Sequence, residues 1–234
     1  MTMEYEKQIE KLTDAIFQFA RGQFGIEKVF EDLLVYIIHG FSPMAEPLGK
    51  ERWPYTREQN AWFMDRLVEL CEIVNEAKAK GELVDVFGAM YMSIAARGHK
   101  SLLGQFFTPP LLADMLSKMV GAEEEKRKTI ADPTCGSGVM LLASAKDNPD
   151  IVVYGNDIDA ICVKMCVCNL VLNGVRGIVT RGDSLSNVYR DGYIVNHISV
   201  EGERVSYIRR LTGEEATAVW IRNTKPVRQN RVTL

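Results

Sequence analysis

The chain has 234 residues, of which 47% are hydrophobic and 25% are charged, and its formal net charge at pH 7 is -3. This composition is typical of a soluble globular protein with one large or two small domains, and it excludes a disordered chain or a membrane-spanning one. A slightly acidic protein also differs from proteins that coat nucleic acid by themselves, so we expect any contact with DNA to be local or shared with a partner.

The cysteine content and the N-terminus predict where the protein works. Five cysteines without the spacing of a disulfide framework favour reduced thiols. The segment from Met1 to Glu10 is acidic and amphipathic and has no signal-peptide pattern. We therefore expect a cytoplasmic protein that is not bound to a membrane.

The first hundred residues are predicted to be helical, because apolar side chains recur at intervals of three and four residues. The four expected helices carry the apolar faces Ile9 to Phe19, Val29 to Ile37, Phe63 to Ala77 and Phe87 to Ile94. Gly and Pro residues end them or lie between them. We predict a helical N-terminal domain over residues 1–100 and a second domain over residues 101–234.

From about Lys128, short β-rich runs alternate with helical runs. Strands are expected at residues 129–131, 151–154 and 177–181, and helices at 139–146 and 159–172. Asp159 is placed to cap the second of these helices and Asn173-Gly174 to end it. This alternation predicts βαβ units, a parallel sheet and therefore an α/β fold.

The pattern changes again beyond Tyr193. Arg204 to Leu211 and Ala216 to Arg222 flank Thr212-Gly213 in the manner of the two arms of a hairpin, which predicts an antiparallel edge. This end of the chain is basic. It is interpreted either as a solvated hairpin and tail or as an edge that contacts phosphates.

A turn with the sequence Asp-Pro-Thr-Cys-Gly-Ser-Gly, from Asp132 to Gly138, connects the first predicted strand to its helix. Its glycines allow the backbone to turn tightly and a ligand to approach it closely at the carboxyl edge of the sheet. The N-terminus of the following helix suits a carboxylate or a phosphate. Leu141 occupies the place of the third glycine of the dinucleotide fingerprint, and no Gly-x-x-x-x-Gly-Lys-Ser/Thr loop is present, which disfavours NAD and ATP.

Two further acids follow the next two predicted strands. Asp157, about twenty residues after the glycine turn, is placed to accept the hydroxyls of a ribose, and Ile158 offers an apolar face to a purine. The alternative is that Asp157 only caps the next helix, although Asp159 can do this instead. Asp183 follows the third strand, where a carboxylate can accept a hydrogen bond from an exocyclic amine.

The segment Gly104-Gln105-Phe106-Phe107-Thr108-Pro109, together with the glycine turn, Asp157 and Asp183, resembles the N6-adenine DNA methyltransferases, and in particular the modification subunits of type I restriction systems. The resemblance implies a Rossmann-like fold for S-adenosylmethionine (SAM) dependent methyl transfer, here without its last strands. It also implies that SAM contacts Phe106, Phe107, Thr108, Pro109, Asp132, Thr134, Cys135, Gly136, Ser137, Gly138, Asp157, Ile158 and Asp183. Thr108-Pro109 is also a favourable helix start, with Thr108 as the cap.

The sequence departs from this family at the catalytic motif. The Asn-Pro-Pro-Tyr or Asn-Pro-Pro-Phe tetrapeptide that holds the target adenine is absent. Asn196 aligns by position with its asparagine, whereas His197 and Ile198 replace the prolines and no aromatic residue follows. Asn196 is the only candidate catalytic residue, and without the motif an extruded base would not be positioned.

Several functions follow from the resemblance. It implies a DNA methyltransferase that modifies adenine N6 in a restriction-modification system, with DNA and a specificity or other system subunit as partners. The alternative is a catalytically inactive SAM-binding or scaffold protein associated with DNA or with a methyltransferase complex. Methylation of protein glutamine or of RNA is a third hypothesis.

No metal site is expected. Cys162, Cys166 and Cys168 lie within a predicted apolar helix and are interpreted as small core residues. His39, His99 and His197 are too scattered to form a site.

Overall fold

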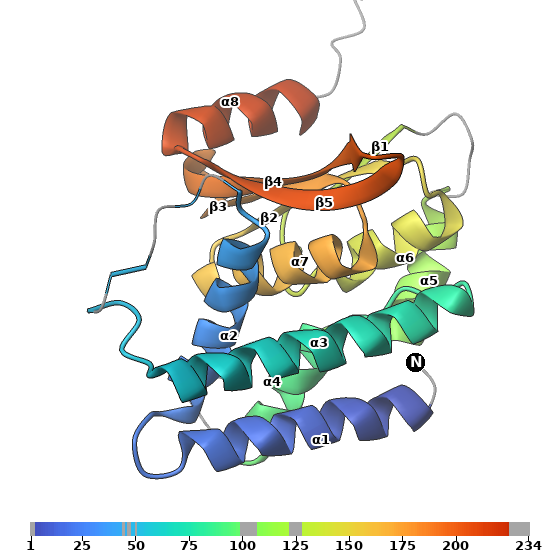
Figure 1. Ribbon diagram of the computed structural model, residues 1–234. Coiled ribbons are helices and arrows are strands. Elements are labelled where there is room, and N and C mark those ends of the chain that lie inside the picture. The colour runs from blue at the N-terminus through green and yellow to red at the C-terminus, as the bar shows by residue number, and fades with distance from the viewer. Residues whose placement is uncertain are drawn as a thin grey trace, which may run out of the picture.

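The computed structural model describes residues 3–43, 45, 48–49, 51–98, 107–121 and 128–224 (Figure 1). Within them the chain forms the helices α1 Met3–Ala20, α2 Ile26–Gly40, α3 Arg57–Ala79, α4 Val86–Ala96, α5 Pro110–Met119, α6 Val139–Asp147, α7 Ala160–Asn173 and α8 Gly213–Thr224. The strands are β1 Thr129–Asp132, β2 Val152–Asp157, β3 Gly177–Asp183, β4 Val188–Val200 and β5 Glu203–Leu211. The four N-terminal helices and the first three strands are confirmed.

The strands form one sheet in the order β1-β2-β3-β4-β5. β1, β2 and β3 are parallel, with Asp132 opposite Gly155 and Asp157 opposite Arg181. β4 and β5 each run antiparallel to their neighbour. The sheet is therefore mixed, and the predicted α/β fold with an antiparallel edge is confirmed.

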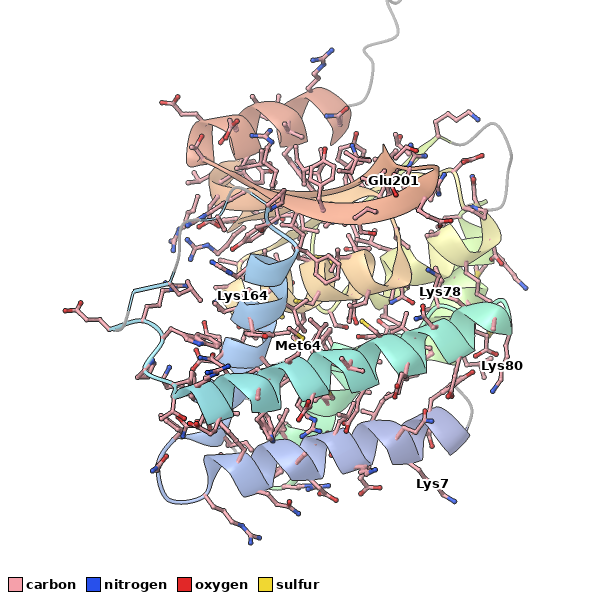
Figure 2. The ribbon with its side chains drawn as sticks, in the orientation of Figure 1. Lys7, Met64, Lys78, Lys80, Lys164 and Glu201 are labelled. Carbon is pink, nitrogen blue, oxygen red and sulfur yellow. The ribbon has the colours of Figure 1, made fainter. Side chains whose placement is uncertain are left out.

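The molecule is layered. α8 covers one face of the sheet and α6 and α7 cover the other (Figure 1). The helices α1, α3 and α4 form a further layer beyond α7. The helix α2 also packs against α7. Side chains fill the space between these layers (Figure 2).

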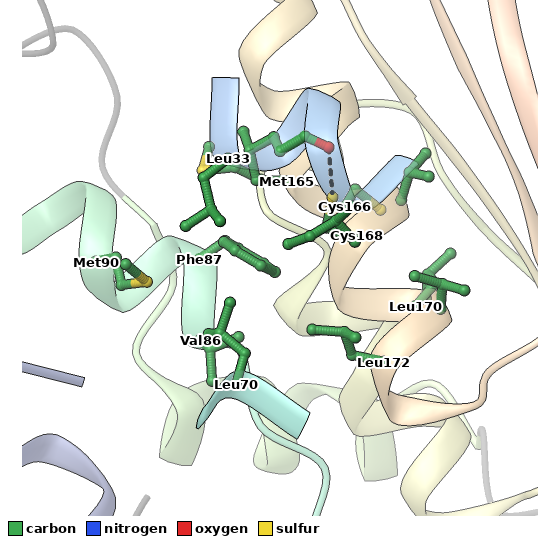
Figure 3. Close-up of a cluster of buried hydrophobic side chains, with 14 of the residues drawn as sticks. Leu33, Leu70, Val86, Phe87, Met90, Met165, Cys166, Cys168, Leu170 and Leu172 are labelled. Atoms are coloured by element: carbon green, nitrogen blue, oxygen red, sulfur yellow. Dashed lines mark hydrogen bonds between the residues drawn. The ribbon is translucent and has the colours of Figure 1, made fainter. Parts of the chain in front are cut away.

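One hydrophobic core joins the N-terminal helices to α7. Its members include Phe87 and Leu33 from the helical layer and Met165 from α7, all of which are at most 1% exposed (Figure 3). Cys168 donates its thiol hydrogen to the carbonyl oxygen of Leu34, with Sγ and O 3.5 Å apart. The division into domains at residue 100 stays a prediction, because residues 99–106 lie outside the described residues.

The cysteines of α7 are core residues, as predicted. Cys162, Cys166 and Cys168 are at most 1% exposed among apolar neighbours. Across the described ranges, no group of three or more His, Cys, Asp or Glu side chains could hold a metal ion.

The predicted hairpin around Thr212-Gly213 is wrong. The hairpin consists of β4 and β5, and its turn lies at Glu201 and Gly202, both of which have positive φ. Residues 213–224 form α8 instead. Thr212 and Glu215 cap this helix reciprocally, since each accepts a hydrogen bond from the other's backbone N–H.

The start of α5 also differs from the expectation. The helix begins at Pro110, with Pro109 rather than Thr108 as its N-cap residue. Several of its large apolar side chains are exposed, with Leu111 75% exposed and Met119 79%, whereas Ala113 is buried. In the described part of the chain, no helix is long and apolar enough to span a membrane.

Candidate functional site

The candidate site lies where the three parallel strands end, and a buried asparagine holds these ends together. The side-chain amide of Asn156, which is 1% exposed, donates to the carbonyl oxygens of Pro133 at 3.1 Å and Gly182 at 3.0 Å. Its own oxygen accepts from the hydroxyl of Thr180 at 2.9 Å. Asn156 therefore ties the glycine turn to the end of β3 across β2, and sequence analysis had given it no role.

The carboxylate of Asp157 lies against the glycine turn. Its Oδ2 accepts from the backbone N–H of Gly136 and its Oδ1 from that of Asp159, both at 2.9 Å. A carboxylate has about four lone-pair positions, so each oxygen keeps capacity for a ligand hydroxyl. Asp159 caps α7 by accepting from the N–H of Ile161 at 2.8 Å, so Asp157 is not needed for that role.

The glycines of the turn are required by their surroundings. Gly136 and Gly138 have φ values of +54° and +92°. A Cβ atom on Gly136 would lie 2.9 Å from the ring of Phe107, and one on Gly138 would lie 2.7 Å from Sγ of Cys166. The bare backbone therefore lets Phe107 on one side and α7 on the other approach the turn closely.

Next to the turn, α4 contributes a partly buried carboxylate. Asp85, the N-cap residue of α4, accepts from the Ser137 hydroxyl at 2.5 Å, the Asn169 amide at 2.6 Å and the backbone N–H of Gly88 at 2.8 Å. Burial raises the pKa of Asp85, and the three hydrogen bonds oppose that shift. Ser137 thus directs its hydroxyl into the protein, and sequence analysis overlooked both Asp85 and Asn169.

Asp132 and Asp183 end β1 and β3 at the same edge. Asp132 accepts a hydrogen bond from the N–H of Thr134 at 3.0 Å. Burial raises the pKa of Asp132, the hydrogen bond from Thr134 lowers it, and the nearby charge of Asp157 raises it. Asp183 is at the surface and accepts from the N–H groups of Leu185 and Ser186. Hydrogen bonds from Ser186 and Leu185 lower the pKa of Asp183.

The same edge carries exposed apolar side chains and the N-terminus of α6. Ile158 is 70% exposed and Leu185 93%. Gly138, the N-cap residue of α6, offers no side-chain cap, so the first turn of α6 presents N–H groups and a positive dipole end. Acids, apolar side chains and a helix N-terminus together suit a ligand with a purine, a ribose and an acidic group.

The structure brings together most of the predicted cofactor residues but not the predicted catalytic one. Phe107, Asp132, the glycine turn, Asp157 and Ile158 lie around one edge, with Asp183 at the end of the neighbouring strand; Phe106 lies outside the described residues. Asn196 lies elsewhere: its neighbour Val195 pairs with Gly177, at the start of β3, whereas Asp183 is at the end. Asn196 is therefore at the opposite edge of the sheet.

The antiparallel direction of β4 explains this position. After Asp183 the chain turns through four residues and runs back along β3, so the residues that follow move away from the candidate site. His197 has a structural role, since Nε2 donates to the Gly174 carbonyl and Nδ1 accepts from the Ser206 hydroxyl, both at 3.1 Å.

Comparison with solved structures supports the fold. A Listeria monocytogenes protein proposed as a class I S-adenosylmethionine-dependent methyltransferase superposes with a TM-score of 0.53 at 13% identity, covering 79% of this chain and 55% of that one. The fold is thus that of class I SAM-dependent methyltransferases.

Comparison of sequences identifies the family. Methanocaldococcus jannaschii proteins named type I restriction enzyme MjaVII and MjaVIII methylase subunits are 31% identical over 134 residues and 33% over 104 residues. These alignments cover 53% and 41% of this chain but only 23% and 17% of the relatives, so the chain matches less than a quarter of their length. The N-6 DNA Methylase family matches residues 82–196, a range that includes Asp85, the glycine turn and Asn196. Over residues 82–196, the chain belongs to the N-6 DNA methylase family.

Proposed function

We propose that this chain binds SAM at the carboxyl edge of β1, β2 and β3, and that it serves N6-adenine methylation of DNA in a restriction-modification system. One observation carries the proposal. The Asn156 amide and the Asp157 carboxylate hold the glycine turn in place beside the end of β3 through hydrogen bonds within the protein. A turn fixed in this way favours binding, because little ordering is needed when the ligand arrives.

Each part of the crevice has a proposed task. The N-terminus of α6 would face the carboxylate of the methionine moiety, beside Phe107, Thr108 and Pro109. Asp157 would accept the ribose hydroxyls, Ile158 would pack on the adenine ring and Asp183 would accept from the adenine amine. SAM supplies an electrophilic methyl group when bound, and the protein's contribution at this edge is to orient it.

The target base requires groups that the described residues do not place at this edge. An adenine must be extruded and stacked so that its amine faces the methyl group. Asn196 cannot do this from the opposite edge of the sheet. We therefore propose that the base is positioned by a partner or by a segment outside the described ranges.

That same position of Asn196 favours a second function, in which the chain binds SAM as a scaffold without catalysis of its own. In both cases the proposed partners are DNA and a specificity or other restriction-modification subunit. The names of the relatives, which are methylase subunits of type I restriction enzymes, support this choice.

Calorimetric titration with SAM tests the crevice. We expect a micromolar dissociation constant for the wild type and at least a tenfold weaker one for Asp157→Ala, a loss of about 1.4 kcal/mol. Asp157→Asn and thermal melting of both variants separate weak binding from misfolding. Asp65→Ala, which changes an exposed carboxylate on α3, is the matched control. An absence of binding by the folded wild type would refute the proposal.

Transfer of labelled methyl groups distinguishes the two functions. The chain is incubated with adenine-containing duplex DNA, alone and with a specificity subunit, and the Asp183→Ala variant is the comparison. Labelling that the variant loses identifies an enzyme, whereas SAM binding without labelling in either mixture identifies a scaffold. Labelling of RNA or protein with unlabelled DNA would support the third hypothesis.

A further inference from the structure

A cavity is lined by none of the residues of the proposed cofactor edge. Its volume is about 650 Å³, and it lies between the second half of α2, the residues that follow that helix and the strands β4 and β5. This volume is within the range of sites for small molecules, about 300 to 1,000 Å³. The Ile208 N–H donates to the carbonyl oxygen of Phe41 at 2.7 Å, which fixes β5 to the end of α2 beside the cavity.

The charged side chains that line this cavity are all basic. They come from three parts of the fold: Arg52 from the segment after α2, Lys164 from α7, and Arg209 and Arg210 from β5. Among the residues that the structure describes, no aspartate or glutamate lines it. This contrasts with the chain as a whole, whose net charge is -3.

Three of the four cations have a carboxylate partner, namely Lys164, Arg209 and, at a longer distance, Arg210. Lys164 pairs with Glu31 of α2 (Figure 2 labels Lys164 beside this helix). Arg209 pairs with Glu215 at 2.9 Å. Because Glu31 and Glu215 lie outside the lining, they orient these two cations without placing negative charge on the wall.

Arg210 and Arg52 are the least compensated of the four cations. Arg210 lies 3.8 Å from Asp191, whose oxygens already accept two hydrogen bonds from Arg181 at 3.0 and 2.7 Å. Arg52 has no side-chain hydrogen bond or ion pair with any residue that the structure describes. Tyr193 is opposite Arg210 in the register of β4 and β5, and Arg52 lines the same cavity. Burial raises the pKa of Tyr193, the charges of Arg210 and Arg52 lower it, and those of Asp191 and Cys168 raise it.

The remaining wall is aromatic and aliphatic. Tyr193 and Tyr207 line the cavity with Val35, Ile38 and Ile208. Among the described residues, neither tyrosine hydroxyl has a hydrogen-bond partner. The cavity therefore combines aromatic and aliphatic side chains with positive charge that carboxylates compensate only in part.

We propose that this cavity binds a nucleoside phosphate, either as a free nucleotide or as one unit of a DNA strand. Arg52 and Arg210 would contact the phosphate groups, since guanidinium groups match phosphate oxygens in geometry. The base would lie against Tyr193, which shares a face of the sheet with Arg210, because aromatic side chains stack on any base. This site is separate from the SAM crevice and does not depend on methyl transfer.

Binding of GTP labelled with the methylanthraniloyl fluorophore tests the proposal. The full chain is titrated by fluorescence anisotropy with saturating S-adenosylhomocysteine, and guanine is used so that the probe differs from the adenine of the cofactor. We expect micromolar binding that persists in Asp157→Ala. Binding should weaken at least tenfold in the double variant R52E/R210E and also in Val35→Phe, which fills the cavity without changing its charge.

The control is the double variant R190E/R222E, which makes the same charge change at exposed arginines outside the cavity. Equal weakening by the two double variants would show nonspecific attraction and overturn the proposal. So would an absence of binding by the wild type, or full binding by folded Val35→Phe.

Competition identifies the source of the nucleotide. Displacement of the probe by unlabelled GTP but not by oligo(dT) assigns the site to free nucleotides. Displacement by oligo(dT) at a lower concentration than GTP, with oligo(dT) counted in nucleotides, assigns the site to a DNA strand. Inorganic triphosphate should compete at least tenfold less well than GTP. Equal competition by triphosphate would refute the contact between the base and Tyr193.

Discussion

The hydroxyl of Ser137 in the glycine turn donates a 2.5 Å hydrogen bond to Oδ2 of Asp85 at the start of α4. The other carboxylate oxygen accepts from the Asn169 amide, and that amide also donates to the Ser137 carbonyl at 2.9 Å. The residues come from α4, the turn and α7, so one buried network connects the helical layer to the proposed cofactor edge. The shape of the turn therefore depends on the helices that precede it.

Removing this carboxylate should destabilise the protein strongly. In Asp85→Ala the Ser137 hydroxyl, the Asn169 amide and the Gly88 N–H lose their acceptor inside the protein. Unsatisfied buried donors cost about 1–3 kcal/mol each, so we expect a loss of about 2–4 kcal/mol in the free energy of unfolding after partial relaxation. Chemical denaturation measures it, and Asp65→Ala on exposed α3 should change stability by less than about 0.5 kcal/mol.

The same carboxyl group should make stability depend on pH. Burial raises the pKa of Asp85 above its ordinary value of 3.8, so the folded protein binds its proton more tightly than the unfolded chain. The resulting stabilisation is complete below that value and is lost as pH rises through the folded-state pKa. The wild type should therefore lose stability relative to Asp85→Asn as pH rises from about 4. A stability difference between the two proteins that is independent of pH would contradict this assignment.

Local signals in the sequence predicted the elements that position the site. Asp159 caps α7 and Gly174 ends it with φ +70°, as the residue types indicate. The alternation of β-rich and helical runs predicted the parallel strands. Because the carboxyl ends of parallel strands share one edge, the placement of Asp132, Asp157 and Asp183 at that edge followed from the sequence.

Interactions between distant residues could not be predicted in this way. Asp85 and Ser137 are 52 positions apart, and only the packing of α4 against α7 brings them together. Thr212-Gly213 fits both a hairpin turn and a helix start. A helix forms here because Ala216 and Trp220, one helical turn apart, pack together on Tyr189 and Leu211 of the sheet. The direction of β4, and with it the position of Asn196, also depends on pairing in the sheet.

Gly138→Ala should lower the free energy of unfolding more than the same substitution at a glycine that has a similar backbone conformation and open space around it. Gly22 has φ +84° and a Cβ added there would have nothing within 4 Å, whereas Gly138 has φ +92° and a Cβ would lie 2.7 Å from Sγ of Cys166. We expect Gly22→Ala to cost about 1–2 kcal/mol through backbone strain alone. Gly138→Ala should add about 1–3 kcal/mol from overpacking.

A double-mutant cycle in chemical denaturation separates these two contributions. Truncation of the thiol in Cys166→Ala should remove most of the overlap, so Gly138→Ala in that background should cost about as much as Gly22→Ala. If the cost of Gly138→Ala is the same with and without the thiol, contact with Cys166 is not its cause.

His197 should make stability depend on pH in the direction opposite to Asp85. It connects the end of α7 to β5 through Gly174 and Ser206, and the carbonyl acceptor requires that Nε2 carry the proton while Nδ1 accepts. Burial lowers the pKa of His197 from its ordinary value of 6.5, the hydrogen bond to Gly174 raises it, and nearby Arg204, Arg176 and Lys78 lower it. The stabilisation is present above about pH 6.5 and is lost as pH falls through the folded-state pKa. Nuclear magnetic resonance titration of the ring should show the lowered pKa, and His197→Gln should lose less stability than the wild type between pH 8 and pH 5. An ordinary or raised ring pKa would mean that protonation leaves the Ser206 contact intact.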